Sequence, residues 1–371
     1  MYAILIFMKR RFQNTMRAKD LAKTIGVSEA TLSLVINGKP GISPKTRQKV
    51  ETQIKELGYG HMLRTDQTVP AAIAASASKV ISFVLYKEKG HLLGSNTFFP
   101  LILEGIESSA RKAGYSLNII NIERTNLEQE LSYFIDSGCA GFVVFATEMH
   151  EDVIPQFESL GIPFVIFDNE FLDKDLNCVK VNNKQGTWLA AKYLAQMGHK
   201  KIGYLSSGLA INSFLERQQY ALDAIRHFAP DSGEDNVYTI GYAHENAREG
   251  MNALLNTLDV KKLPTAFLVD NDLVAIGAMQ SLKAHGYKIP DDFSFVGYDD
   301  RPICTLTDPP LTTIQLPRER FGAAAVELLI KHLEEAPSSR VTIEINSRLI
   351  VRDSVSNRII RTASTTKNPT A

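Results

Sequence analysis

The stretch AKDLAKTIGVSEATLSLVINGKPGISPKTRQKVETQIKELGY, residues 18–59, decides how the first part of this 371-residue chain folds. Its apolar residues recur every three or four positions, which is the spacing of one buried face of a helix. This spacing predicts three short helices, at 18–24, 29–37 and 44–57. Two short helices joined by a glycine-containing turn, with a third packed against them, form a helix-turn-helix.

Turn and capping residues mark where these helices begin. Gly26 separates the first two, because glycine tolerates turn conformations that other residues resist. Ser28 and Ser43 stand directly before the second and third helices, where a hydroxyl accepts a hydrogen bond from a free backbone N–H. Pro44 at the first helical position is a further start signal, since no N–H is needed there.

Charge is distributed unevenly along the chain. The formal net charge is zero, yet residues 1–64 hold 12 Lys or Arg against 4 Asp or Glu, so that segment carries +8 and the remainder −8. Such a segment either presents a solvated basic surface or binds a polyanion, and a helix-turn-helix favours DNA. The basic side chains expected near phosphates are Lys19, Lys23, Lys39, Lys45 and Arg47.

The stretch 18–59 closely resembles the headpiece of the LacI/GalR family of transcription regulators. The resemblance implies that Glu29, Ala30 and Leu34 read base edges in the major groove. Most family members carry Arg at the position of Leu34, whereas Leu offers only apolar contact, so the resemblance does not imply the operator sequence. The positions that match family contacts to the DNA backbone are Thr31, Ser33 and Asn37.

Residues 61–79 have few bulky apolar side chains and cannot form a core. They are either a flexible tether or, as the resemblance implies, contain a hinge helix that inserts an apolar wedge into the minor groove. Pro70 then falls at the helix start and Ile73 at the wedge. Together with the headpiece, the expected DNA-binding residues are Lys19, Ser28, Glu29, Ala30, Thr31, Ser33, Leu34, Asn37, Lys39 and Ile73.

Residues 1–15 are expected to be an unstructured or non-native extension. Their apolar run is eight residues long, whereas a membrane span needs about 20. Basic residues follow this run, the reverse of a signal peptide. Three widely spaced cysteines fit neither a disulfide framework nor a metal site. We therefore expect a cytoplasmic protein.

From residue 80 on, about ten apolar runs typical of buried strands alternate with helical patterns, in two groups. This alternation predicts parallel sheets covered by helices. We expect a helix-turn-helix domain at 16–60 and an α/β effector-binding domain of two doubly wound subdomains at 80–356. The expected boundaries are 80–181 with 315–340 for the first subdomain, 182–314 with 341–356 for the second, and a tail at 357–371.

Ligands of open α/β sheets bind beyond the carboxyl ends of the strands. Carboxylates, an amide, a guanidinium and aromatic rings follow the predicted strands, a set that suits a small polyhydroxy ligand. Each strand-end Asp or Asn is also a common helix N-cap, and one of the two Phe residues is expected in the core. The residues expected to contact an effector are Phe98, Phe99, Asp168, Arg217, Asn271 and Asp299.

The resemblance to the LacI/GalR family continues through the body of the chain. MGHKKIGYL (197–205), VDNDLVAIGAM (269–279) and FSFVGYDD (293–300) are close to family signatures and imply a type I periplasmic-binding-protein-like core. The chain departs from the family at Tyr220, where Gly is usual, and at 316–318. Ligand identity therefore does not transfer.

These observations predict a sequence-specific transcriptional repressor that acts as a homodimer on double-stranded DNA. A small ligand, expected to be a sugar or sugar derivative, controls its operator affinity. A periplasmic-type solute-binding protein is the alternative, but it would not carry a basic helix-turn-helix. An enzyme is not expected, because GxSxG, GxxxxGK, HExxH and GxGxxG motifs are absent, and no cofactor, metal or membrane partner is implied. Replacing Arg217 or Asp299 by Ala should weaken ligand binding and leave folding intact, because both are expected at loop ends.

Overall fold

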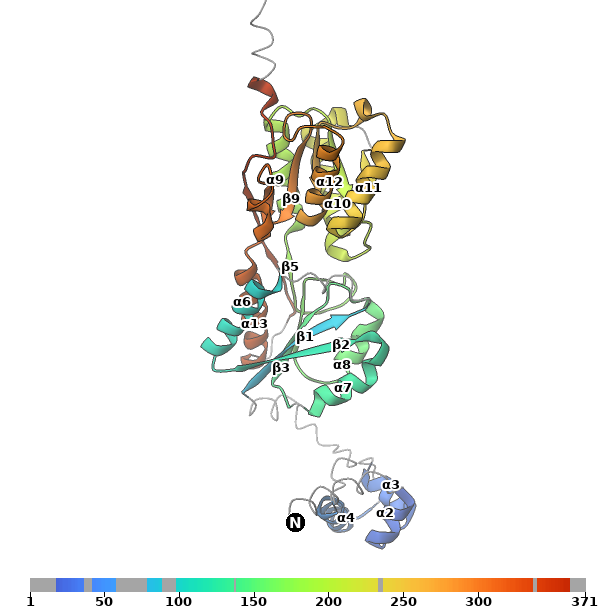
Figure 1. Ribbon diagram of the computed structural model, residues 1–371. Coiled ribbons are helices and arrows are strands. Elements are labelled where there is room, and N and C mark those ends of the chain that lie inside the picture. Colours follow the sequence, from blue (N-terminus) through green and yellow to red (C-terminus); the bar gives the residue numbers. More distant parts are fainter. Residues whose placement is uncertain are drawn as a thin grey trace, which may run out of the picture. The chain divides into compact units, whose positions relative to one another are not determined.

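The computed structural model describes residues 18–36, 42–57, 79–88, 98–136, 138–232, 236–335 and 339–360. The chain divides into two compact units, residues 1–71 and 72–371 (Figure 1). The expected contact residues Asn37, Lys39 and Ile73, the extension at 1–15 and the linker up to residue 78 lie outside the described ranges. Within those ranges no helix combines the length and the hydropathy that a membrane crossing requires.

The first unit holds three helices, α2 (Ala18–Ile25), α3 (Glu29–Ile36) and α4 (Pro44–Glu56). Both predicted caps form, because Thr31 N–H donates to Ser28 Oγ at 3.0 Å and Thr46 N–H donates to Ser43 Oγ at 3.1 Å. The helices enclose one small core of Leu21, Ala22, Ile25, Leu32, Val35, Val50 and Ile54. The predicted helix-turn-helix is confirmed.

The second unit contains two six-stranded sheets, and the first is parallel throughout in the order β11-β5-β4-β3-β1-β2. Its strands are β1 (Val80–Lys87), β2 (Ser116–Glu123), β3 (Gly141–Phe145), β4 (Phe164–Phe167), β5 (Cys178–Val181) and β11 (Thr342–Ile345). Helices α6 (Phe99–Lys112) and α13 (Arg318–Glu334) pack on one face, and α7 (Leu127–Asp136) and α8 (Ile154–Glu158) cover the other.

The second sheet has the order β12-β10-β9-β8-β6-β7 and is parallel except for β12, which runs antiparallel to β10. Its strands are β6 (Ile202–Ser206), β7 (Val237–Thr239), β8 (Ala266–Val269), β9 (Ser294–Asp299), β10 (Thr312–Gln315) and β12 (Arg348–Ile350). Helices α9 (Asn183–Gln196) and α10 (Asn212–Phe228) cover one face, and α11 (His244–Thr257) and α12 (Asp272–Ala284) the other. Short 3-10 helices lie at Arg124–Asn126, Glu151–Val153, Pro230–Ser232, Val260–Lys262 and Pro302–Thr305.

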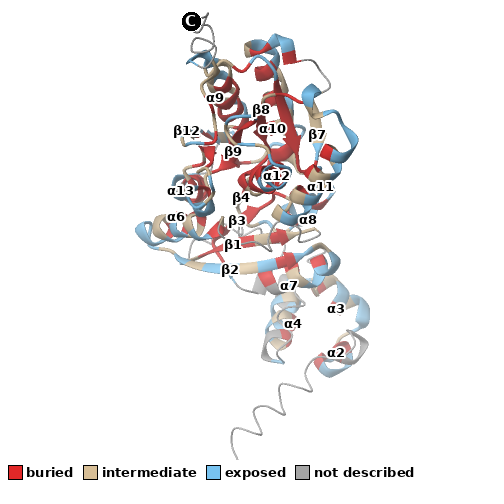
Figure 2. Ribbon diagram, turned by 45° about the horizontal axis from the view of Figure 1, so that its top comes forward, coloured by how far each residue is buried: buried red, intermediate tan, exposed pale blue. Residues whose placement is uncertain are grey.

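Burial follows from this layering. Every residue of β3 and of β8 is buried, as their continuous apolar sequences predict for strands covered on both faces. The edge strand β2 is largely exposed or half-buried within this unit (Figure 2). The two predicted doubly wound subdomains are confirmed.

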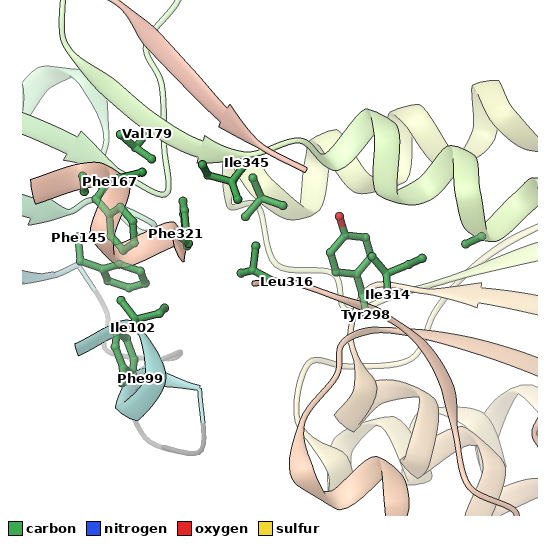
Figure 3. Close-up of a cluster of buried hydrophobic side chains, with 14 of the residues drawn as sticks. Phe99, Ile102, Phe145, Phe167, Val179, Tyr298, Ile314, Leu316, Phe321 and Ile345 are labelled. Carbon is green, nitrogen blue, oxygen red and sulfur yellow. The ribbon is translucent and has the colours of Figure 1, made fainter. Parts of the chain in front are cut away.

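The chain crosses between the subdomains three times, after β5, after β10 and after β11. The expected boundary at 341 is wrong, because β11 pairs with β5 in the first sheet and the second sheet resumes only at β12. Leu316 and Ile345, on two of these crossings, lie between the aromatic core of the first subdomain and the side chains of Tyr298 and Ile314 (Figure 3).

Candidate functional site

The second helix of the headpiece presents the surface that base reading requires. Its inner positions, Leu32 and Val35, are buried, whereas Glu29, Ala30 and Ser33 are exposed. Leu34 is half-buried, and so is Thr31, whose hydroxyl lies 2.8 Å from Ser28 Oγ. The α3 surface therefore offers short side chains and one carboxylate at its amino-terminal end.

The basic side chains around α3 have different roles. Lys23 is exposed, as a phosphate contact requires. Arg47 is half-buried and donates from Nη1 to the Leu34 carbonyl at 3.5 Å, so it also ties α4 to the end of α3. The side chains of Lys19 and Lys45 lie outside the described part of the headpiece.

The strand ends of the α/β unit carry unusual backbone. Asp168, after β4, has φ 65°, and Asp299 and Asp300, at and after the end of β9, have φ 104° and 52°. They are the non-glycine residues with positive φ in the described ranges. Such conformations cost about 1–3 kcal/mol each and concentrate at functional sites. These three residues lie at or directly after the ends of the strands where the sequence predicts an effector site.

Arg217 and Asp299 meet, as predicted, but deep inside the protein. Both are 4% exposed, and Arg217 Nη2 lies 3.3 Å from Asp299 Oδ1. Arg217 also donates from Nε to Asn183 Oδ1 at 3.1 Å and from Nη1 to the Asp270 carbonyl at 2.8 Å. Its guanidinium lies 3.8 Å from the centre of the Tyr298 ring. The expectation that these two residues sit at accessible loop ends is therefore wrong, because α10 carries Arg217 into the core.

Asp168 belongs to the same polar group. Its carboxylate accepts a hydrogen bond from Thr147 Oγ1 at 2.6 Å. Burial raises the pKa of Asp168 to about 6, although the hydrogen bond from Thr147 and the charge of Arg217 oppose that rise. A carboxyl group with a pKa raised by burial is common at functional sites.

Asp272 accepts hydrogen bonds that fix the turn after β9. This fully buried carboxylate accepts from Arg301 N–H at 2.7 Å and from Thr313 Oγ1 at 2.5 Å. Burial, with a contribution from the nearby charge of Asp299, raises the pKa of Asp272 to about 7. Asp272 thus connects the backbone of Arg301, two residues after Asp299, to Thr313 of β10.

The remaining predicted effector residues, Asn271, Phe99 and Phe98, have three different environments. Asn271 caps α12, since its Oδ1 accepts from Val274 N–H at 3.0 Å, which is the alternative that the sequence left open. Phe99 is buried and packs edge-on against Phe145 at 5.0 Å between ring centres, so it belongs to the core (Figure 3). Phe98 is half-buried, with the guanidinium groups of Arg301 and Arg318 5.8 and 5.9 Å from its ring centre.

A cavity of about 670 Å³ opens between the two subdomains. The six predicted effector residues do not line it, but Thr147 and Asn169, next to Asp168 in space or sequence, do. Strand-end position could have indicated these two, because Thr147 follows β3 and Asn169 follows β4. The complete lining is Glu88, Thr147, Glu148, Met149, His150, Glu151, Asn169, Glu170, Phe171, Gly208, Leu209, Ala210, Ile211, Asn212 and Leu215.

The cavity wall is acidic and partly apolar. Four glutamates line it and no Lys or Arg does so among the described residues. Two of these glutamates form ion pairs with residues that do not line the cavity. Glu88 pairs with Arg124 at 3.2 Å, and Glu170 pairs with Lys180. Hydrophobic periodicity does not mark these glutamates, because Glu88, Glu148 and Glu170 lie in loops and Glu151 begins a short 3-10 helix.

An exposed recognition helix on one unit and a polar cleft between two α/β subdomains on the other define a DNA-binding transcriptional regulator. Residues 17–60 match the model of bacterial regulatory proteins of the lacI family, and residues 191–355 match that of a periplasmic binding protein-like domain. The HTH-type transcriptional repressor PurR of Mannheimia succiniciproducens is 32% identical over 340 residues, which span 91% of this chain and 98% of that protein. The chain belongs to the LacI family and is a transcriptional repressor rather than an enzyme.

Further relatives agree in length and architecture. PurR of Pasteurella multocida is 29% identical over 92% of this chain and 99% of its own. Among solved structures, the Lac repressor dimer bound to operator and the anti-inducer ONPF superposes with a TM-score of 0.66 at 23% identity, over 92% of this chain and all of that one. A CelR–cellobiose complex gives 0.65 at 24% identity, with the same coverage. These likenesses show the shared fold.

Proposed function

We propose that a small uncharged ligand, held in the cavity between the two subdomains, controls the operator affinity of this repressor. The cavity of about 670 Å³, lined by residues of both subdomains, carries this proposal. A ligand that binds one arrangement of the subdomains better than the other shifts the population toward it. In a homodimer, which we infer from the family, that shift changes the placement of the two headpieces on DNA.

The cavity wall favours an uncharged ligand. Anions such as sugar phosphates would face glutamates, with no Lys or Arg among the described lining residues to offset them. A cationic ligand would compete with Arg124 and Lys180 for these glutamates. Apolar side chains, among them Met149, Phe171 and Ile211, offer flat contacts, while Thr147 and Asn169 offer hydrogen bonds. A planar heterocycle with polar edges suits this mixture, and the shared name PurR of the relatives favours a purine-related ligand over the sugar that the sequence suggested.

The site is tested with ligand panels and one conservative variant. Thermal-shift measurements with purine bases, pentoses, hexoses and disaccharides should identify a purine base, whose affinity is then measured by calorimetry. Thr147→Val removes a hydroxyl from the cavity wall and should lower that affinity about ten- to a hundredfold, because a polar partner left unpaired costs about 1–3 kcal/mol. The exposed Thr125 provides the control, and Thr125→Val should bind as the wild type does.

The outcomes separate the ligand class from the site. A sugar that binds with the same dependence on Thr147 would correct the class and keep the site. Equal affinities of Thr147→Val and the wild type for whichever ligand binds would contradict the site.

On the DNA side, we propose that Glu29, Ala30 and Leu34 read bases, and that Lys23 and the start of α3 contact the backbone. The exposed positions of Lys23 on α2 and of Glu29 and Ala30 on α3, with the partial exposure of Leu34, support this. The homodimer should select a roughly palindromic sequence, because two headpieces related by two-fold symmetry read two half-sites.

Leu34→Arg should change the selected sequence. Arginine can bind guanine through two hydrogen bonds, which is worth about 1–3 kcal/mol where the geometry permits. Selection from random DNA should therefore return guanine at one position per half-site where the wild type prefers another base. Gln48→Arg adds the same charge to an exposed position of α4 and should raise affinity without changing the consensus. An unchanged consensus for Leu34→Arg would show that this position does not read bases.

A further inference from the structure

Lys180 occupies an unusual position in the α/β unit. It lies in β5, immediately before the first crossing between the subdomains, and its side chain is 6% exposed. Its ammonium group donates to Glu170, in the first-subdomain loop after β4, and to Glu216, on α10 of the second subdomain. Glu344 of β11 lies 3.9 Å from the same nitrogen. One cation therefore joins three carboxylates across the cleft.

The junction extends in both directions. Glu170 lines the cavity, so one end of the network is accessible to a ligand. At the other end Glu216 accepts from Asn183 Nδ2 at 2.8 Å, and Asn183 Oδ1 accepts from Arg217 Nε at 3.1 Å. A chain of hydrogen bonds thus runs from the cavity wall to the buried Arg217 and Asp299.

The charged form of Lys180 is stable in this environment. Burial alone would lower the pKa of Lys180, but its hydrogen bonds to Glu170 and Glu216 outweigh burial and hold the pKa above its ordinary value. The ammonium is therefore present throughout the physiological pH range. Without it, Glu170 and Glu216 would face each other, because two acceptors of one ammonium lie within about 6 Å of each other.

We propose that Lys180 is a positioning residue that holds the two subdomains in the arrangement of this structure before any ligand binds. Its loss leaves like charges on opposite sides of the cleft, and their repulsion opens it. The proposal concerns the ligand-free protein, so it stands apart from the identity of the ligand. If the proposed effector binds this arrangement, Lys180 raises its apparent affinity. The reason is that apparent affinity scales with the population of the binding-competent state.

The test measures the separation of the subdomains directly. Spin labels on Glu158→Cys in α8 and Glu249→Cys in α11, both exposed, report on the first and second subdomain. The three native cysteines are buried and need no replacement. The doubly labelled chain is refolded with an excess of unlabelled chain, so that each homodimer carries at most one labelled chain. Pulsed electron resonance on this full-length, ligand-free protein should give one narrow distance for the labelled parent. Lys180→Met should shift the main distance to a longer value, by more than the width of the parent peak.

Two comparisons make the result decisive. Lys192→Met, at an exposed position of α9, should leave the distribution unchanged. Adding Glu216→Gln to Lys180→Met removes the repulsion and should return the distribution toward the parent; this double variant also serves if Lys180→Met alone does not fold. A lower melting temperature for Lys180→Met with the parent distance intact would show a merely structural role and overturn the proposal, as would a double variant as open as the single one.

Discussion

A chain that begins at Val80 is expected to lose operator binding completely. The helix-turn-helix lies before this residue, and so does the whole excess of positive charge, because residues 1–64 carry +8 and the rest carries −8. An acidic body repels the phosphate backbone, so even the sequence-independent part of DNA affinity should vanish. Fluorescence anisotropy with a duplex selected by the full-length protein measures the loss.

Salt and folding controls complete this experiment. Affinity of the full-length protein should fall steeply with added salt, since each neutralised phosphate releases counterions. The truncated chain should keep the melting transition of the α/β unit and its response to any ligand found for the full-length protein. Retained operator binding by the truncated chain would contradict the assignment of the headpiece.

Arg217→Ala is expected to destabilise the α/β unit by about 3–5 kcal/mol, the usual result of removing one partner from a buried ion pair. The substitution leaves the Asp299 carboxylate, which is 4% exposed, without its cation. It also removes the hydrogen bonds that Arg217 donates to Asn183 Oδ1 and to the Asp270 carbonyl. Urea unfolding at 25 °C measures the free energy of unfolding. This result would reverse the expectation, drawn from sequence, that folding survives.

The matched control is Arg226→Ala on the same helix. Arg226 is half-exposed and pairs with Asp223 three residues earlier, so its loss should cost no more than about 1 kcal/mol. Adding Asp299→Asn to Arg217→Ala should recover part of the lost stability, because the stranded charge disappears. Similar costs for Arg217→Ala and Arg226→Ala would indicate that the buried network contributes little.

Local signals explain what could be predicted from the sequence. Ser28 and Ser43 cap helices because their hydroxyls act within three residues, and continuous apolar runs such as that of β3 indicate strands buried on both faces. The strand-end rule, with the family resemblance, also brought Arg217 and Asp299 to one place. Their burial could not be predicted, because it depends on Tyr298 and Asn183, which reach Arg217 only after packing.

Loops and short strands account for the remaining differences. Glu88 and Glu170 line the cavity from segments without hydrophobic periodicity, so no pattern marks them. The four residues of β11 would read as a strand in either sheet, and only pairing with β5 assigns them to the first. Asn271 and Phe99 show the opposite case, in which a residue type suited to a ligand has a cap or core role instead.

The three crossings have a consequence for synthesis on the ribosome. The first sheet contains β1 near the start of the α/β unit and β11 near its end, and α13 covers it from residues 318–334. A nascent chain therefore cannot complete its first subdomain until it has been translated past residue 345, when the second subdomain is also nearly complete. The headpiece, whose core is formed entirely within residues 21–54, can fold early in translation, whereas the subdomains that would respond to a ligand become complete together and late.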